Sequence, residues 1–306
     1  MPTLDDVRAA AARVARHVRR TPLLAVTGVD PSPPGDLRLK LECLQVTGSF
    51  KARGAANRLL ALDPAVVGRG VVTASGGNHG LAVAWAARRQ GARAVVFVPG
   101  SAPAVRREAL ARRGAEVVVA GDVWDDAHAA ALVRAARDGL TYVHPFADPE
   151  VVAGQGTVGL ELLADAPDVD TVLVAVGGGG LIGGVALALP GVRVVGVEPT
   201  GAPTLHASLA AGALVTLPRI TTAAGSLAPR RTAPLNLALA RRHVERVVLV
   251  DDDALRAGAR WLWSELGVAA ELGGAAAAAA LLTGAYAPAP GERVVAVVCG
   301  AGTDGL

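Results

Sequence analysis

Short valine-rich runs alternate with alanine-rich helical segments along almost the whole chain, and this alternation limits the possible folds more than any other feature. Segments 78–91 and 102–114 have the composition and periodicity of helices. The valine-rich runs have the length and composition of buried parallel strands, and they lie at residues 70–75, 92–99, 115–121, 171–177, 193–199, 246–251 and 293–300. Strands and helices that alternate in this way predict an α/β fold, in which helices cover both faces of mostly parallel sheets.

The composition indicates a compact globular protein. Of its 306 residues, 52% are hydrophobic and 19% are charged, which allows a sizeable buried core. No apolar run is long enough to cross a membrane, and the acidic N-terminus is unlike a signal peptide. A net charge of +3 with scattered arginines predicts no nucleic-acid partner. With only two cysteines, Cys43 and Cys299, we expect a reduced, cytoplasmic environment.

Three segments outside the main pattern also have a structural interpretation. The N-terminal residues 1–22 predict an amphipathic helix. Residues 269–282 are mostly alanine, leucine and glycine, and their helix propensity predicts a buried helix packed closely on a sheet. The proline-rich segment 31–36 predicts a surface turn.

The chain hardly uses lysine. Only two of its 30 basic residues are lysines, Lys40 and Lys51, and the others are arginines. Arginine stays protonated and does not readily form an imine, so a retained lysine is a candidate for amine chemistry. Lys51 follows a Gly-Ser-Phe turn and opens a helical segment, where the helix dipole tends to lower the pKa of an ammonium group. For Lys40 we expect chance retention, and an ordinary solvated lysine is the alternative for Lys51 taken alone.

Three further segments combine small residues with polar side chains after a strand. In 73–80, small residues let backbone amides approach an anion at a helix N-terminus. In 172–189, four consecutive glycines form a concavity of N–H groups that suits a phosphate. In 294–305, a strand leads Cys299 into a glycine-rich turn. Taken singly, these segments also fit a tight turn, a structural histidine and a buried thiol.

The glycine-rich segment has a second interpretation. Gly178, Gly180 and Gly183 fit the Gly-x-Gly-x-x-Gly pattern of a dinucleotide-binding turn, and Glu198 follows at about the expected interval. An NAD-dependent oxidoreductase is therefore an alternative function. It leaves the Gly-Ser-Phe-Lys turn, the Ser-Gly-Gly-Asn turn and the rarity of lysine unexplained.

Together these segments resemble the fold-type II pyridoxal-phosphate (PLP) enzymes, specifically the serine/threonine dehydratase and serine racemase family. GSFKARGA resembles the family's cofactor-lysine signature, SGGNHG its substrate-carboxylate loop and VGGGGLIGG its phosphate-binding turn, and HPFADPEVVAGQGTVGLEL at 144–162 is also similar. The resemblance covers nearly the whole chain. It implies an α/β fold of two domains, like the tryptophan synthase β subunit, each with a mostly parallel sheet flanked by helices. We expect a large PLP-binding domain at 1–67 and 148–306 and a small substrate-loop domain at 68–147.

The resemblance also implies roles for individual residues. Lys51 carries PLP as a Schiff base and later takes the α-proton of the substrate. The cofactor is bound by Lys51 together with Phe50, Asn78, Gly177, Gly178, Gly179, Gly180, Leu181, Gly225 and Cys299. The substrate carboxylate lies against Ser75, Gly76, Asn78 and His79. Because Cys299 offers the pyridine nitrogen a neutral thiol, the ring is a weaker electron sink, which suits prompt loss of a β-hydroxyl group.

Several departures from the family pattern narrow the expected activity. Gly76 stands where serine racemases have a serine that acts as a second acid–base group, which favours elimination over racemization. Thr204 stands where an aspartate is expected to complete a divalent-cation site with Glu198, and the segment 223–225 also lacks its usual acid, so we expect no tight metal site. Gly302 replaces an asparagine near the cofactor. The chain stops just after its last strand, so we expect no C-terminal regulatory domain.

The sequence therefore predicts a PLP-dependent dehydratase, an ammonia-lyase that converts L-threonine, L-serine or both to a 2-oxo acid and ammonia. A serine or amino-acid racemase on the same scaffold is the main alternative, and a non-catalytic PLP-binding protein is another. Phe146 resembles the threonine-type members, although one methyl group changes binding by only about one to three kcal/mol. The resemblance also implies a small amino-acid substrate and a homodimer.

Overall fold

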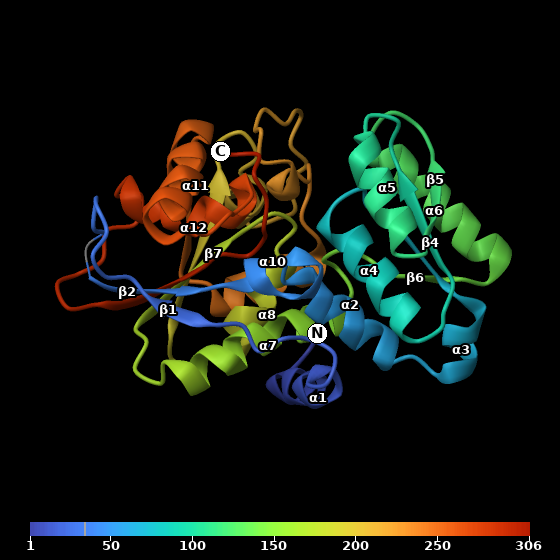
Figure 1. Cartoon of the computed structure of the whole chain (residues 1–306), viewed down its shortest axis with the longest axis horizontal. Coiled ribbons are helices and arrows are strands. Elements are labelled where there is room, and N and C mark those ends of the chain that lie inside the picture. The colour runs from blue at the N-terminus through green and yellow to red at the C-terminus, as the bar shows by residue number, and fades with distance from the viewer. Residues whose placement is uncertain (34) are drawn as a thin grey trace.

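A computed structural model describes residues 1–33 and 35–306 and contains two separate sheets (Figure 1). The larger sheet has the strand order β1-β2-β10-β7-β8-β9, and its neighbours are parallel except for the antiparallel pair β1 and β2. Its strands are β1 (Leu23–Ala25), β2 (Asp36–Lys40), β7 (Thr171–Ala175), β8 (Arg193–Pro199), β9 (Arg246–Val250) and β10 (Arg293–Val297).

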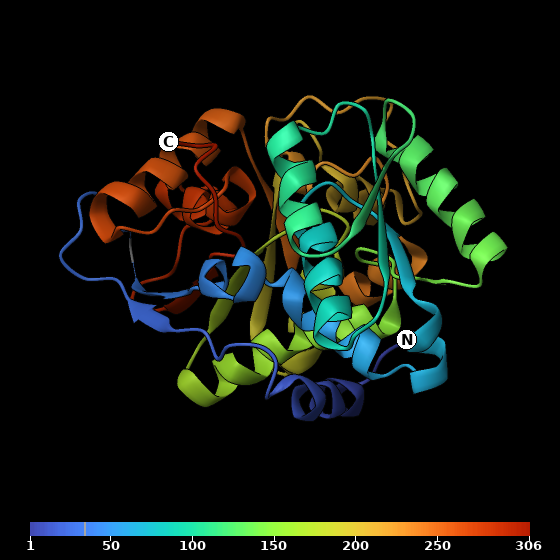
Figure 2. The ribbon, with the colours of Figure 1, turned by 45° about the vertical axis from the view of Figure 1, so that its right-hand side comes forward.

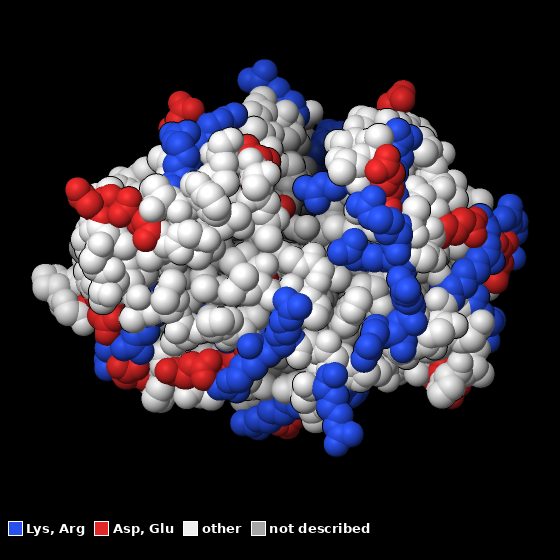
Figure 3. All heavy atoms as spheres, in the orientation of Figure 1, with Lys and Arg blue, Asp and Glu red and all other residues white. Residues whose placement is uncertain are grey.

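The smaller sheet is fully parallel and has the order β5-β4-β3-β6. Its strands are β3 (Val71–Ala74), β4 (Ala94–Val98), β5 (Glu116–Val119) and β6 (Thr141–Tyr142). All four lie inside the segment 68–147, while the predicted domain limits stay a prediction. In the space-filling view, the surface is hollowed between the part built on the larger sheet and the part built on the smaller one (Figure 3).

Helices cover both sheets. In the larger part, α1 and α7 lie side by side on one face of the sheet, and α11 and α12 lie on the other (Figures 1 and 2). In the described part of the chain, no helix is both long and apolar enough to span a membrane. The helices are α1 (Leu4–Val14), α2 (Lys51–Leu60), α3 (Pro64–Arg69), α4 (Asn78–Arg89), α5 (Ala104–Arg112), α6 (Trp124–Asp138), α7 (Pro149–Asp165), α8 (Gly180–Ala188), α9 (Thr204–Ala211), α10 (Pro234–His243), α11 (Asp252–Leu266) and α12 (Leu272–Leu282).

The seven valine-rich runs are all strands, which confirms the predicted α/β alternation. The same pattern does not predict β1, β2 or β6, because β1 and β6 are short and β2 alternates charged residues with leucine. The alanine-rich segment forms α12, which is buried from Leu272 to Leu281 as expected. The predicted turn at 31–36 contains Pro34, which lies outside the described residues.

The alanine-rich sequence of α12 has a packing explanation. A Cβ atom at Gly258 on α11 would lie 3.0 Å from the Cβ atom of Ala279 and 3.1 Å from the carbonyl oxygen of Ala275. The two helices therefore approach more closely than larger side chains permit. On its other side α12 contacts the larger sheet, and the backbone N–H of Glu271, the residue before its first turn, donates to the Gly300 carbonyl just beyond β10.

A buried ion network holds the start of α2. Arg53 is fully buried and donates to both carboxylate oxygens of Glu42, at 2.8 and 2.7 Å, and to both of Glu161, at 2.7 and 3.0 Å. Lys40 is also fully buried, and its Nζ donates to the Thr21 carbonyl at 2.8 Å and to Glu161 at 2.6 Å. The expectation of chance retention at Lys40 is thus wrong, because this ammonium group joins β2 to α7.

Candidate active site

Lys51 is the first residue of α2, and its amine lies beside the segment that leaves the smaller sheet. Its Nζ donates a hydrogen bond to the Pro145 carbonyl at 2.7 Å and lies 5.0 Å from the centre of the Phe50 ring. Burial lowers the pKa of this amine to about 8, against the opposing influence of Cys299 and Glu271. The sequence attributes this lowering to the helix dipole, whereas the structure assigns it chiefly to desolvation. At pH 7 about one tenth of Lys51 is therefore uncharged, and this fraction rises to about one half at pH 8.

A carboxyl group that the sequence does not single out lies next to Asn78. Asn78 Nδ2 donates to Glu271 Oε1 at 2.9 Å, and the Glu271 backbone N–H donates to the Gly300 carbonyl at 3.1 Å. Burial raises the pKa of Glu271 above its ordinary value. A Cβ atom at Gly300 would lie 2.7 Å from Glu271 Oε1 and 3.3 Å from Asn78 Nδ2, so a side chain there would displace the Glu271 carboxyl group. Glu271 escapes sequence analysis because it precedes a low-complexity run and is 193 residues from Asn78.

Cys299 continues β10 into the same region. Its thiol is 3% exposed and lies 3.5 Å from the Gly273 carbonyl oxygen, to which it donates. Burial, reinforced by the nearby Glu271, raises the thiol pKa well above its usual range. Cys299 is therefore a neutral group, as the resemblance implies. The Phe50 N–H donates to the Cys299 carbonyl at 3.2 Å, which joins this turn to the start of α2.

The four-glycine turn joins β7 to α8 and is packed against Phe146. Gly179 has a φ of +90°, a left-handed conformation that favours glycine. A Cβ atom at Gly178 would lie 2.2 Å from the Phe146 ring, and one at Gly180 would lie 3.0 Å from the Phe146 backbone. The sequence explains these glycines by the approach of an anion, whereas the structure adds a second reason, because Phe146 occupies the space of a side chain. The Leu181 side chain is buried in the core behind the turn.

A second turn lies against the glycine turn. A Cβ atom at Gly177 would lie 3.1 Å from the Ser226 carbonyl oxygen and 3.2 Å from Leu227 Cα. These two residues belong to the short helix Gly225–Leu227. A Cβ atom at Gly225 would meet nothing within 4 Å, so this glycine borders open space. The structure therefore brings Gly225 and the glycine turn together.

The loop after β3 carries the predicted substrate residues. Ser75 Oγ accepts a hydrogen bond from the Gly77 N–H at 3.3 Å, and Gly76 has no side chain. His79 is 2% exposed, and its Nε2 lies 3.1 Å from the Val143 carbonyl oxygen. Burial and the nearby Lys51 lower the His79 pKa to about 3, so the ring is neutral. Because Nε2 serves the backbone, His79 has a structural function here, and its predicted contact with substrate stays a prediction.

The residues present fit a phosphorylated pyridine aldehyde. A partly desolvated amine at Lys51 supplies the nucleophile for its carbonyl carbon. The N-terminus of α8 directs backbone amides into the glycine turn, where a phosphate is favoured. The neutral thiol of Cys299 suits a ring nitrogen that carries no proton. Open space at Gly225 leaves room for a planar group next to this glycine.

The metal prediction depends on Glu198, whose carboxylate already has partners. Glu198 is buried in β8 and accepts hydrogen bonds from the backbone N–H groups of Leu205 and His206, each at 2.8 Å. Burial raises its pKa to about 8. Thr204 Oγ1 donates to the Pro229 carbonyl at 2.7 Å. Among the residues that the structure describes, no group of three His, Cys, Asp or Glu side chains is arranged for a metal ion.

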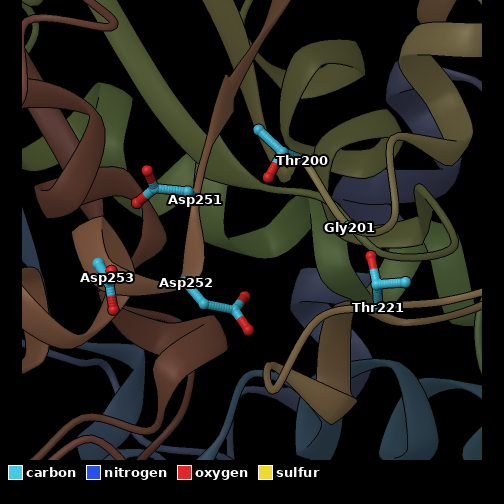
Figure 4. Close-up of a pocket in the computed structure, with 6 residues that line it drawn as sticks. All are labelled: Thr200, Gly201, Thr221, Asp251, Asp252 and Asp253. Carbon is cyan, nitrogen blue, oxygen red and sulfur yellow. The ribbon is translucent and has the colours of Figure 1, made fainter.

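A separate hollow of about 320 Å³ lies where β8 and β9 end (Figure 4). Two of its three acidic side chains accept local hydrogen bonds. Asp251 accepts from the Ala254 N–H at 2.7 Å, which begins α11. Asp252 accepts from the Thr222 hydroxyl at 2.5 Å and from the Ala223 N–H at 2.6 Å. The hollow is lined by Thr200, Gly201, Thr221, Asp251, Asp252 and Asp253.

Comparison with known proteins gives one consistent family. Residues 14–300 match the pyridoxal-phosphate dependent enzyme family. The chain is 38% identical over 308 residues to an L-threonine ammonia-lyase from Thermotoga maritima, with 99% of this chain and 76% of that protein covered. It is 41% identical over 313 residues to a phenylserine dehydratase from Ralstonia pickettii, with 99% and 94% covered. The structure of maize serine racemase superimposes with a TM-score of 0.94 at 36% identity, covering 98% of this chain and 93% of that one.

Proposed function

The chain belongs to the family of pyridoxal-phosphate-dependent enzymes and has its type II fold, and we propose that it is a dehydratase. In this proposal it converts L-threonine, L-serine or both to the 2-oxo acid and ammonia by α,β-elimination. The observation that carries the proposal is Lys51, an amine of lowered pKa held by one hydrogen bond at the start of α2. The relatives include both dehydratases and racemases, so the family alone does not decide between them.

Each predicted site residue has a proposed task. Lys51 binds the cofactor covalently and takes the α-proton of the substrate. The cofactor supplies an electron sink for the charge that develops at that carbon. Cys299 faces the ring nitrogen as a neutral thiol, and Phe50 and Gly225 flank the ring. The cofactor phosphate is held by the amides of the glycine turn, which comprises Gly177, Gly178, Gly179, Gly180 and Leu181.

Asn78 and its loop complete the proposed site. One N–H of the Asn78 amide is held by Glu271, so the other is available for the phenolic oxygen of the cofactor. The loop of Ser75, Gly76, Asn78 and His79 holds the substrate carboxylate with side-chain donors and with backbone N–H groups of the turn other than that of Ser75, which donates to the Phe97 carbonyl at 3.0 Å. Because these donors lie at the N-terminus of α4, the helix dipole favours the carboxylate there.

Gly76 favours elimination over racemization. Racemization needs an acid on the face of the substrate opposite Lys51, and Gly76 offers no proton there. A Cβ atom at Gly76 would lie 3.3 Å from the Cβ atom of Ala102, so a serine fits after a small shift of Ala102. We expect Gly76→Ser to form measurable D-serine from L-serine, with Gly76→Ala as the matched control that gains none.

The decisive experiment combines a spectrum with a product assay. Purified protein supplied with PLP should absorb visible light, and borohydride should attach the cofactor to the peptide that contains Lys51. L-Serine, L-threonine and phenylserine are then offered, and 2-oxo acid and D-amino acid are measured separately. Release of 2-oxo acid supports the dehydratase, whereas D-amino acid without 2-oxo acid refutes it. A protein that takes up no PLP refutes the cofactor assignment of Lys51.

The remaining expectations are part of the same proposal. We propose that residues 1–67 and 148–306 act as the PLP-binding domain and residues 68–147 as the substrate-loop domain. We also propose a cytoplasmic homodimer with a small amino-acid substrate and no membrane or nucleic-acid partner. Size-exclusion chromatography with light scattering tests the dimer directly.

A further inference from the structure

The segment 143–147 links the smaller sheet to α7, and its backbone carbonyls receive side-chain donors from several elements. The Val143 carbonyl accepts from Thr73 Oγ1 at 2.8 Å and lies 3.1 Å from the ring nitrogen of His79. The Pro145 carbonyl accepts from Lys51 Nζ at 2.7 Å. The Phe146 carbonyl accepts from Asn236 Nδ2 at 3.0 Å. The position of this backbone therefore decides where the amine of Lys51 finds its acceptor.

His144 shapes this segment from within. Its Nδ1 accepts hydrogen bonds from the N–H groups of Phe146, at 3.2 Å, and Ala147, at 2.9 Å. These two bonds fold the chain around Pro145 in the manner of an Asx turn. Pro145 has no N–H to donate and holds the preceding residue in extended conformations. The turn therefore depends on the acceptor at His144.

The protonation state of His144 suits this function. An Nδ1 atom that accepts two N–H donors carries no proton, which places the ring proton on Nε2. Burial, together with the nearby His128 and Lys51, lowers the pKa of His144 to about 4. The ring stacks edge-on against Phe146, with centroids 4.6 Å apart. At neutral pH His144 is thus an uncharged, immobilised acceptor.

We propose that His144 is a positioning residue whose neutral Nδ1 holds the turn 144–147, so that the Pro145 carbonyl stands within hydrogen-bond reach of the Lys51 amine. This carbonyl orients the amine whenever Lys51 is not bonded to the cofactor. The inference rests on the proposed function of Lys51 as the cofactor lysine. It assigns to His144 no proton transfer and no contact with substrate.

The rarity of lysine makes a direct test possible. Protein labelled with ¹³C at the lysine ε-carbon has only two side-chain signals, from Lys40 and Lys51, and Lys51→Arg assigns them. The Lys51 signal of the cofactor-free protein is followed by NMR through its titration. Lys40 is buried in its ion pair and serves as the internal reference. The ionisable groups that act on Lys51 can each change its pKa, and the variants must therefore leave their charges unchanged. These groups are Glu271, Cys299, His79 and His144.

Four variants distinguish the effect of the Nδ1 acceptor, which holds the turn, from the effect of packing by the His144 ring. His144→Asn keeps an acceptor near the position of Nδ1, whereas His144→Phe keeps a ring without an acceptor. His144→Gln moves the acceptor one bond outward and serves as a second test in case the phenylalanine variant does not fold. Tyr142→Phe is the matched control, because it removes a hydroxyl that contacts His128 Nδ1 and the Ala74 backbone and leaves the turn 144–147 unchanged.

A hydrogen bond to a carbonyl stabilises the ammonium more than the neutral amine. We therefore expect the pKa of Lys51 to fall by about one unit in His144→Phe and in His144→Gln, and to stay unchanged in His144→Asn and Tyr142→Phe. Since His144 is neutral in this pH range, its replacement removes no charge, and the shift reports geometry. An unshifted Lys51 in folded His144→Phe or His144→Gln overturns the proposal. So does a shift in His144→Asn as large as in His144→Phe. Because no PLP is present, this result is independent of the borohydride experiment.

Discussion

Replacement of Arg53 by methionine should strongly destabilise the protein. Arg53 is fully buried two residues after Lys51, and its guanidinium group makes six hydrogen bonds, four to Glu42 and Glu161 and one each to Thr157 and the Arg19 carbonyl. Methionine fills a similar volume but leaves the buried Glu42 carboxylate with the Thr21 hydroxyl as its only hydrogen-bond partner among the described residues. Breaking a buried ion pair on one side costs about 3–5 kcal/mol. That is a large fraction of a typical stability of about 5–15 kcal/mol.

Chemical denaturation at neutral pH measures this loss, and two comparisons identify its cause. Arg137→Met removes an arginine that is 67% exposed and paired with Asp138, and it should change the stability little. The double variant Arg53→Met with Glu42→Leu removes both charges, so it should recover much of the stability lost in Arg53→Met. A loss for Arg53→Met no larger than that for Arg137→Met would refute the reasoning, as would a double variant less stable than the single one.

The cost of Arg53→Met should also depend on pH. Burial alone raises the pKa of Glu161, but hydrogen bonds from Arg53 and Lys40 hold it below its ordinary value. A carboxyl group whose pKa is lower in the folded protein contributes stability above its unfolded pKa. That contribution is lost as the pH falls through the folded pKa. The difference in stability between wild type and Arg53→Met should therefore shrink as the pH is lowered from neutral into this acidic range.

Three further substitutions have defined outcomes. Lys51→Arg keeps the positive charge but forms no imine, so borohydride should attach no PLP and 2-oxo acid release should disappear, while the melting temperature changes little. Glu271→Gln keeps the size of the side chain but weakens the hold on Asn78, and we expect kcat to fall about tenfold, which corresponds to one hydrogen bond of about 1.4 kcal/mol. Gly154→Ala would place a Cβ atom 2.6 Å from Gly54 Cα where α2 crosses α7, and overpacking should cost about 1–3 kcal/mol in thermal unfolding.

The main strands and helices can be predicted from the sequence pattern, because buried parallel strands need continuous apolar runs and in this chain those runs are rich in valine. The pattern fails at β2, where Asp36, Arg38 and Lys40 alternate with leucines. The two cations have partners distant in sequence, since Arg38 pairs with Asp168 and Lys40 with Glu161, although Arg38 also pairs with Asp36 within the strand. No local sequence pattern predicts these distant pairings, so β2 is recognised as a strand only from the structure of the sheet.

The candidate site also contains residues that the sequence predicts and residues that it does not. Lys51, Asn78, the glycine turn and Cys299 lie in motifs of unusual composition, which sequence analysis detects. The groups that position them have no such signal. The acceptor for Lys51 is a backbone carbonyl, which every residue possesses, and Glu271 precedes a run of alanines. Groups that position a functional residue can be identified only from the structure, because distance and burial define them.

Charge alone does not explain why the chain retains its two lysines, since arginine carries the same charge. The size and the acidity of the side chain explain it. At position 40 the space between the Thr21 carbonyl and Glu161 admits a compact ammonium group, which donates to these two acceptors at 2.8 and 2.6 Å, and the fork of Arg53 already occupies the other side of Glu161. A second planar guanidinium group would need more room than this fully buried position offers. At position 51 the requirement is the opposite, because the amine must lose its proton, and an arginine does not do so at any pH at which the protein is folded. A chain that otherwise uses arginine therefore keeps lysine at position 40 because its ammonium group is compact, and at position 51 because its ammonium group can lose a proton.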